Sequence, residues 1–250
     1  MPHLHQPDAP VVLLHGALQD RRLWALQIDA LAAAGRTVLA LDLPGHGDAP
    51  GPAAASIEAA AQWLLAELQR RGVARATLVG HSMGSLVALE AASHWGEQAT
   101  GLVLVGTASP MRVAPALLQA ALDEPMALIP QIAAISHGVR GAPASRDEAQ
   151  RWATSIALMS DNQSHYAAAG HGSLAHHDLA LCDAYADALA AAARVRCPSL
   201  VVVGERDKMT PGKAATSLIA ALNAALITLP AGHAMMSDAA EALNAALLRR

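Results

Sequence analysis

Short, predominantly apolar runs recur along this chain, and stretches with helical spacing separate them. The runs occupy residues 11–14, 37–41, 76–79, 102–105, 200–203 and 225–229. Continuous hydrophobicity is typical of strands that are buried on both faces of a parallel sheet. Residues 56–71 carry apolar side chains at helical spacing, with Ser56 as the predicted N-cap and Gly72 as the predicted stop. The pattern therefore predicts an α/β fold with a doubly wound, mostly parallel sheet.

One serine is predicted to lie at the apex of a sharp turn between a strand and a helix. Residues 80–84 read Gly-His-Ser-Met-Gly, and they join the third apolar run to a helical stretch over 85–93. This is the pattern of a nucleophile elbow. It needs glycine on both sides of Ser82, because the serine takes a strained backbone conformation and a Cβ atom at either neighbour would collide across the turn. We therefore predict that Ser82 is a catalytic nucleophile.

Two residues further along the chain are candidates for the groups that activate Ser82. A serine hydroxyl is a poor nucleophile unless a base takes its proton and a carboxylate orients that base. Asp207 lies just after the fifth apolar run, and His233 lies after the sixth. Asp207 has an alternative role as an exposed loop acid paired with Arg206 or Lys208. Its position at a strand end favours the catalytic role, and we expect Ser82, Asp207 and His233 to form a triad.

The chain order serine, aspartate, histidine resembles that of the α/β-hydrolase superfamily. The first apolar run ends in His15-Gly16, as the corresponding strand of that family does. In the family, the residue after this glycine and the residue after the nucleophile donate their backbone N–H groups to the oxyanion. The resemblance therefore implies that Ala17 and Met83 form an oxyanion hole.

A second stretch carries the same resemblance. Residues 42–48 are similar to the family's Asp-x-x-Gly-x-Gly loop, although the chain has Asp48 where many relatives have serine. We interpret this loop as scaffold. The resemblance covers residues 10–109 and 199–250, and it implies an α/β-hydrolase fold.

The remaining part of the chain is predicted to be an inserted lobe. Residues 110–198 separate two predicted strands, whereas such connections usually have about 2–6 residues outside the helix. They resemble in position and length the helical caps of many α/β-hydrolases. We expect an α/β-hydrolase core at 1–109 and 199–250 and a helical cap insertion at 110–198. Within the cap, a capping box at 145–148 predicts a helix through 159, and Ser173 a helix over 174–193.

The start of the chain differs from that of many relatives. They begin with two strands before the His-Gly strand, but ten residues precede Val11 here. We expect this N-terminal strand hairpin to be missing, which would leave the strand at 37–41 near an uncovered edge of the sheet.

Composition narrows the possible partners and locations. The net charge is −4 without charge runs, which favours neither nucleic acid nor an anionic membrane as a partner. The N-terminus lacks the pattern of a signal peptide, and no window approaches the ~20 apolar residues of a spanning helix. Cys182 and Cys197 lack CxxC spacing, which favours reduced thiols. We therefore expect a cytoplasmic protein.

Several other side chains have a functional and a structural interpretation. The histidines of the cap could suggest a metal site, but they lack the spacing of metal ligands. We expect them to lie at the solvated start of a helix. We expect the protein to use neither a metal nor an organic cofactor. Three arginines could bind a substrate carboxylate, although solvated helix faces explain each of them. The aliphatic cap residues could line an acyl pocket or only hold the cap together. These sets are His171, His176 and His177; Arg112, Arg140 and Arg151; and Leu117, Leu118, Leu122, Met126, Leu128, Ile129 and Ile132.

Histidines outside the cap are expected to be structural. His15 and His46 lie in glycine-bounded turns, and we interpret both as parts of the scaffold. His81 precedes the nucleophile, and we expect its ring to pack beside the elbow.

The resemblance implies a serine hydrolase that acts through an acyl-enzyme on a small-molecule substrate. The expected substrates are small or medium carboxylic esters, thioesters or lactones. Two alternatives stay open: a carbon–carbon bond hydrolase of ring-fission products, and a non-catalytic ligand receptor on the same fold. The sequence leaves the natural substrate and the oligomeric state open.

Overall fold

A computed structural model describes residues 9–49, 51–138 and 142–249 of the chain. Its described strands form a six-stranded sheet in the order β2-β1-β3-β4-β5-β6, and every neighbouring pair is parallel. The strands are β1 (Val11–Leu14), β2 (Val38–Leu41), β3 (Ala76–His81), β4 (Ala99–Val105), β5 (Ser199–Gly204) and β6 (Ala225–Leu229). The predicted parallel sheet is confirmed, with each strand close to its apolar run.

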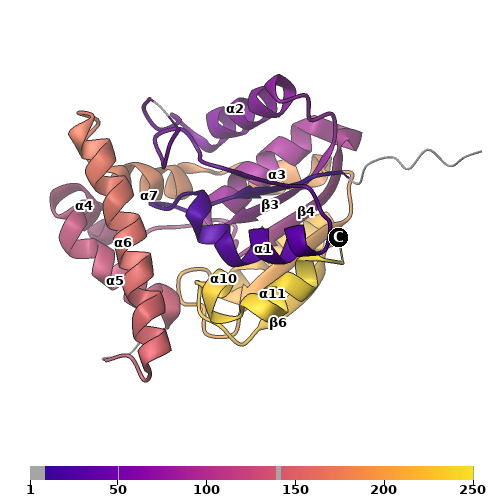
Figure 1. The fold of residues 1–250 in the computed structure, drawn as a ribbon. Helices are drawn as coiled ribbons and strands as arrows, with labels where there is room; N and C mark the ends of the chain where they lie inside the picture. The colour runs from indigo at the N-terminus through magenta and orange to yellow at the C-terminus, as the bar shows by residue number, and fades with distance from the viewer. Residues whose placement is uncertain (1–8, 50, 139–141, 250) are drawn as a thin grey trace, which may run out of the picture.

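Helices connect the strands and surround the sheet (Figure 1). They are α1 (Ala25–Ala33), α2 (Ile57–Arg70), α3 (Met83–Trp95), α4 (Pro115–Asp123), α5 (Pro125–His137), α6 (Arg146–Ala168), α7 (Leu174–Ala184), α8 (Ala188–Arg194), α9 (Thr216–Leu222), α10 (Met235–Asp238) and α11 (Ala240–Leu247). The predicted signals of α2 are confirmed: Ser56 accepts a hydrogen bond from the backbone N–H of Ala59, and Gly72 has a φ of +71°.

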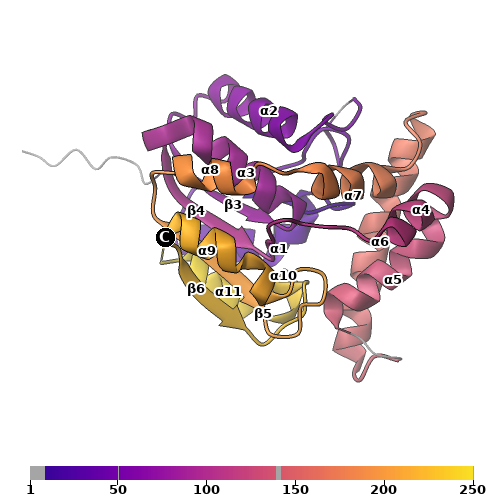
Figure 2. The ribbon, with the colours of Figure 1, turned by 180° about the vertical axis from the view of Figure 1, so that it is seen from behind.

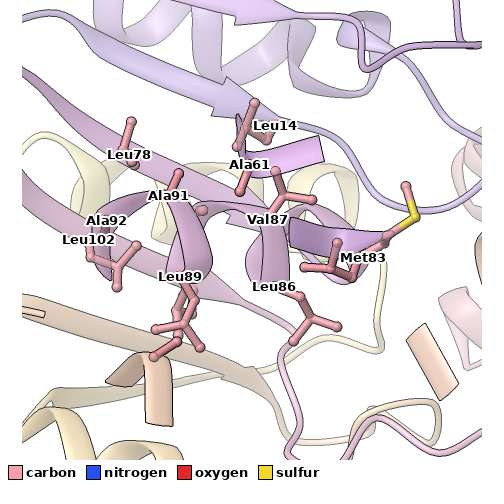
Figure 3. Close-up of a cluster of buried hydrophobic side chains, with 14 of the residues drawn as sticks. Leu14, Ala61, Leu78, Met83, Leu86, Val87, Leu89, Ala91, Ala92 and Leu102 are labelled. Atoms are coloured by element: carbon pink, nitrogen blue, oxygen red, sulfur yellow. The ribbon is translucent and has the colours of Figure 1, made fainter. Parts of the chain in front are cut away.

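Alternate residues of the strands face two apolar layers. Leu14, Leu78 and Leu102 pack with α2, α3, α8 and α9 on one face. Figure 2 shows these helices on that side of the sheet, and Figure 3 shows the three leucines near side chains of α2 and α3. Leu13 and Val79 pack with α1, α10 and α11 on the other face. Each fully buried leucine contributes about 1.5–3 kcal/mol relative to an exposed one, so these layers hold the sheet between the helices.

The four helices α4–α7 form a separate group beside the sheet (Figure 1). Their buried side chains make a third apolar cluster, which includes Ile129, Met159 and Leu174 and also Leu18 from the loop after β1. The next helix, α8, packs against α3 and α9 on the face of the sheet. The predicted division of the chain into core and cap stays a prediction.

Two expectations for the helices after β4 differ from the structure. The helix that Ser145 caps does not end near residue 159 but continues to Ala168. The stretch 174–193 is not one helix, because α7 ends at Ala184 and α8 begins at Ala188. Tyr185 lies at this break, and its hydroxyl donates a hydrogen bond of 2.5 Å to Glu90 of α3. This buried contact with the core accounts for the break.

The sheet register brings the functional loops together. Leu14 of β1 pairs with Gly80 of β3, and Gly204 of β5 pairs with Leu229 of β6. Because parallel strands end at the same edge, the loops that follow them meet there. Among the described strands, β2 lies at one edge of the sheet, where we expected the run at 37–41. The predicted loss of the hairpin concerns residues 1–8, which lie outside the described residues.

Candidate active site

Ser82 lies in the turn between β3 and α3 with a φ of 51° and a ψ of −120°. Few residues other than glycine adopt this conformation, and it costs about 1–3 kcal/mol. A Cβ atom on Gly80 would lie 2.1 Å from the carbonyl oxygen of Gly84, and one on Gly84 would lie 2.3 Å from that of His15. The predicted need for glycine on both sides of Ser82 is confirmed.

Asp207 and His233 lie in neighbouring loops, after β5 and after β6. Nδ1 of His233 lies 2.8 Å from Oδ2 of Asp207, and both side chains are buried. Asp207 therefore pairs with a histidine and not with Arg206 or Lys208. The structure brings together the carboxylate and the imidazole that the sequence predicted as partners.

Thr210 completes the surroundings of this pair. Its hydroxyl donates to Oδ2 of Asp207 at 2.8 Å and lies 3.1 Å from Nδ1 of His233. Oδ1 of Asp207 accepts the backbone N–H groups of Met209 and Thr210, each at 2.9 Å. Burial alone would raise the pKa of Asp207, but the neighbouring His233 and the hydrogen bonds from Thr210 lower it. Asp207 is thus held as a carboxylate beside the imidazole.

Two residues pack directly on the ring of His233. The His81 ring lies 4.6 Å from it, centroid to centroid, and Nε2 of His81 donates to the His233 carbonyl oxygen at 3.1 Å. Burial lowers the pKa of His81 well below 6.5, so this ring is neutral. Gly106, with a φ of +60°, lies against the other side, where an added Cβ would come within 3.0 Å of Cε1 of His233. The expectation that His81 packs beside the elbow is confirmed.

Ser82 and His233 line one cavity of about 260 Å³. Nε2 of His233 is buried and has no hydrogen-bond partner among the described residues, Ser82 included. Catalytic hydrogen bonds of this kind are often formed only when substrate is bound. The cavity is mainly aliphatic, and its lining includes Leu117, Leu128, Ile132, Ile135, Met159 and Leu179.

The predicted oxyanion donors lie on both sides of Ser82. Ala17 lines the cavity, in the loop after β1. A Cβ on the preceding Gly16 would lie 3.2 Å from Cβ of Ser82, which shows how closely this loop approaches the serine. Met83 is the first residue of α3, where the backbone N–H has no acceptor inside the helix.

Other candidates from the sequence have structural partners. Oδ1 of Asp42 accepts the backbone N–H of Arg21 and Oδ2 that of Asp48, which supports the scaffold interpretation of the loop at 42–48. Nδ1 of His176 bonds the Leu118 carbonyl oxygen, and Nε2 of His177 bonds that of Ala54. Within the described ranges, no three His, Cys, Asp or Glu side chains come together in a group that could hold a metal ion.

The cap side chains divide into different environments. Leu117, Leu128 and Ile132 line the cavity, Leu118 and Ile129 pack inside the third apolar cluster, and Leu122 and Met126 are half exposed. Arg112 also lines the cavity, where it donates to the Asp183 carbonyl oxygen at 3.0 Å. Arg151 instead bonds Asp238 at 3.1 Å, and Arg140 lies outside the described residues. Of the two among these arginines that the structure describes, only Arg112 thus lines the cavity that Ser82 lines.

Sequence reasoning missed two residues that surround the pair of Asp207 and His233. Thr210 and Gly106 were not candidates, although Gly106 directly follows β4 and Thr210 lies in the loop after β5. Their positions at the carboxyl edge of a parallel sheet are the signal that could have found them.

None of the helices described for this chain is long and apolar enough to cross a lipid bilayer.

Comparison with known proteins extends this description. The chain is similar to a thermophilic esterase of known structure, with 26% identity and a TM-score of 0.76 over 96% of this chain and 88% of that one. The enol-lactonase of Burkholderia xenovorans LB400 shares the fold, with 24% identity and a TM-score of 0.78 over 97% of this chain and 91% of that one. The pimeloyl-[acyl-carrier protein] methyl ester esterase of Vibrio atlanticus is 36% identical over 105 residues, which are 42% of this chain and 39% of that esterase.

The curated relatives are matched over part of their length, between 18% and 39% for those compared. The family comparison covers far more of this chain. The model of the alpha/beta hydrolase family matches residues 11–246, which include every described strand and helix up to the last but one residue of α11. The chain therefore belongs to the alpha/beta hydrolase family.

Proposed function

We propose that this chain is a serine hydrolase of small or medium carboxylic esters, thioesters or lactones. The observation that carries the proposal is a single cavity lined by Ser82 in its strained turn and by His233, which is paired with the buried Asp207. The esterases among the compared proteins, at 26% and 36% identity, support ester chemistry.

In the proposed first step, Ser82 Oγ attacks the carbonyl carbon while Nε2 of His233 takes its proton. Asp207 keeps Nδ1 of His233 protonated and stabilises the positive charge that forms. The backbone N–H groups of Ala17 and Met83 hold the oxyanion of the tetrahedral intermediate. The intermediate collapses, and the leaving alkoxide or thiolate takes the proton from His233.

In the second step, water attacks the acyl-enzyme while His233 takes a proton from it. The proton passes to Ser82 Oγ as the acid product leaves. Every proton transfer uses the one nitrogen of His233 that has no partner among the described residues. Desolvation in the aliphatic cavity strengthens these interactions in the transition state.

The cavity favours an aliphatic acyl group. Leucine, isoleucine and methionine supply eight of its 21 lining residues, and none of the lining residues is Phe, Trp or Tyr. The proposed cap, built from α4–α7, supplies most of these side chains. A flexible methionine such as Met159 adapts to chains of different shape.

The test is labelling with a fluorophosphonate probe together with a panel of p-nitrophenyl esters, lactones and a ring-fission product. We expect Ser82 to be labelled and esters or lactones to be cleaved, with both signals lost in Ser82→Ala. Faster turnover of the ring-fission product than of any ester would favour the carbon–carbon bond hydrolase. A folded protein that neither labels nor turns over a substrate would favour a ligand receptor.

A further inference from the structure

Leu18, which follows the proposed oxyanion donor Ala17, has a backbone conformation that leucine rarely adopts. Its φ is +62°, and its side chain is 1% exposed within the third apolar cluster. A non-glycine residue in the left-handed region has an unfavourable conformational energy, so surrounding contacts must hold it there. The peptide between Ala17 and Leu18 is therefore fixed by the neighbours of Leu18.

The contact that holds Leu18 comes from α7. Oδ2 of Asp178 accepts the backbone N–H of Leu18 at 2.7 Å, although the two residues are 160 positions apart. The same oxygen lies 2.9 Å from Nε2 of His46. Asp178 is fully buried, and among the described residues its other oxygen has no hydrogen-bond partner. Its hydrogen bonds are thus made with the loops around the candidate active site.

His46 is placed to balance the charge of Asp178. Its Nδ1 faces the Pro44 carbonyl oxygen at 3.0 Å and its Nε2 faces the carboxylate, so both nitrogens are placed to donate. Burial opposes a charge on this ring, but the Asp178 carboxylate and the backbone hydrogen bonds at Pro44 and Leu43 together raise the pKa of His46. The Asp178 carboxylate is therefore paired inside the protein and stays a strong acceptor for Leu18.

The other end of the same turn is held by His15. Its Nδ1 donates to the Gly16 carbonyl oxygen at 2.8 Å, and its Nε2 accepts the backbone N–H of Leu43 at 3.0 Å. The His15 ring lies 4.8 Å from that of His46, centroid to centroid. Burial and the charge of His46 lower the pKa of His15 to about 4, so this ring is neutral. The turn from His15 to Leu18 is thus bonded at both ends.

We propose that Asp178 is a positioning residue for the oxyanion hole, which it aligns by holding Leu18 N–H and thereby the adjoining Ala17. This inference rests on the proposed function, because Ala17 N–H is the donor that it aligns. It makes α7 part of the catalytic apparatus without any contact between Asp178 and the substrate. A helix outside the sheet would then set the geometry in which the transition state is stabilised.

Loss of the carboxylate is expected to act on the transition state and not on substrate binding. Removing one oxyanion donor outright lowers kcat by about 10²–10³-fold, and misplacing it costs less. For Asp178→Ala we expect kcat to fall by roughly 10–100-fold while KM changes by less than about threefold. Asp178→Asn keeps one oxygen that can accept from Leu18, but a neutral amide is a weaker acceptor than a carboxylate, so it is expected to recover only part of this loss.

The experiment compares wild type, Asp178→Ala, Asp178→Asn and the control Glu90→Gln on the best ester of the panel. Glu90 is also a buried carboxylate bonded to a histidine, His94 at 2.8 Å, but it lies two turns along α3 from Ser82. A trifluoromethyl ketone of the same acyl chain, to which Ser82 adds to form a hemiketal oxyanion, measures oxyanion binding. Its Ki should rise in proportion to the fall in kcat, whereas Ki for the free acid product should stay constant.

The result that overturns the inference is an Asp178→Ala protein whose kcat and ketone Ki equal those of wild type well below its Tm. An equal effect in Glu90→Gln would also overturn it, since the effect would then be general destabilisation. If Asp178→Ala does not fold, Asp178→Asn must show the paired change in kcat and Ki. Wild-type protein that is neither labelled by the probe nor active on any substrate overturns the proposed function, and this inference with it. If the wild type is active and Asp178→Ala behaves like it, only the inference on Asp178 is overturned.

Discussion

The carbonyl oxygen of Ser136, at the end of α5, accepts a hydrogen bond of 2.9 Å from the backbone N–H of Ala234, the residue after His233. The contact joins the helices beside the sheet to the loop that carries the imidazole. Gly232 lies in the same contact, where a Cβ would come within 2.4 Å of the Ser136 oxygen. The backbone segments around Ser136 and Gly232 can therefore approach this closely only because residue 232 is glycine.

Gly232→Ala is expected to separate these segments, because backbone atoms on both sides cannot yield as a flexible side chain does. We expect a loss of about 2–3 kcal/mol in the free energy of unfolding by urea, together with a fall in kcat. Gly212→Ala is the control, since its Cβ would meet Val203 at an ordinary distance of 3.4 Å. Equal stability losses in the two variants would contradict the prediction.

Thr210→Val removes the hydroxyl that bonds Asp207 and keeps the shape of the side chain. One hydrogen bond contributes about 1 kcal/mol, which corresponds to roughly fivefold in kcat/KM on the best ester. Asp207 keeps the two backbone N–H groups and His233, so most activity should remain. Thr210→Ser restores the donor and should restore the rate; a serine variant as slow as the valine variant would exclude this explanation.

Ser82→Ala and His233→Ala are each expected to lower kcat by at least about 10³-fold. The double variant should be little slower than either single variant, because a nucleophile and its base act as a unit. Single-turnover rates on the best ester measure all three. Ser82→Ala retaining a tenth of the wild-type rate would remove Ser82 from the mechanism.

The pair of His46 and Asp178 predicts a pH-dependent stability. Because the pKa of His46 is raised above 6.5 in the folded protein, its contribution is fully present below 6.5 and is lost as the pH rises through the raised value. His46→Gln should therefore cost roughly 3 kcal/mol at pH 6 and clearly less at pH 9. Urea unfolding at both pH values measures this cost, and His46→Gln made in an Asp178→Asn background should cost nearly the same at both. The same cost at both values would mean that His46 is not charged in the fold.

The aliphatic cavity predicts a dependence on acyl chain length. Each buried methylene contributes about 0.8 kcal/mol, so kcat/KM should rise up to about fourfold per carbon from acetyl until the cavity is full, and then fall. Ile132→Ala enlarges the cavity that Ile132 lines and should move the best chain to a longer one. A profile without a maximum, or a maximum that does not move in Ile132→Ala, would mean that the acyl chain does not bind in this cavity.

Local physical constraints made much of this protein predictable. The apolar runs mark strands because a strand buried on both faces needs continuous hydrophobicity, and the structure has a strand at each of them. Gly80 marks the elbow because sterics within one turn exclude a Cβ there, whereas a Cβ at Gly84 is excluded by the His15 carbonyl oxygen just after β1. Asp207 and His233 were predictable because parallel strands end at one edge, which the family order of the triad reinforces.

Tertiary packing decided what these local signals do not encode. The hydrogen bond between Asp178 and Leu18 spans 160 positions, and no periodicity or motif connects the two. Tyr185 ends α7 because Glu90 of another helix accepts its hydroxyl, although the stretch itself has helical propensity throughout. Apolar spacing states which face of a helix is buried, but the partner that covers the face depends on the packing of the whole chain. The sequence therefore determined the sheet, the elbow and the order of the candidate triad, and only the packed structure decided how the helices beside the sheet hold the loops around Ser82.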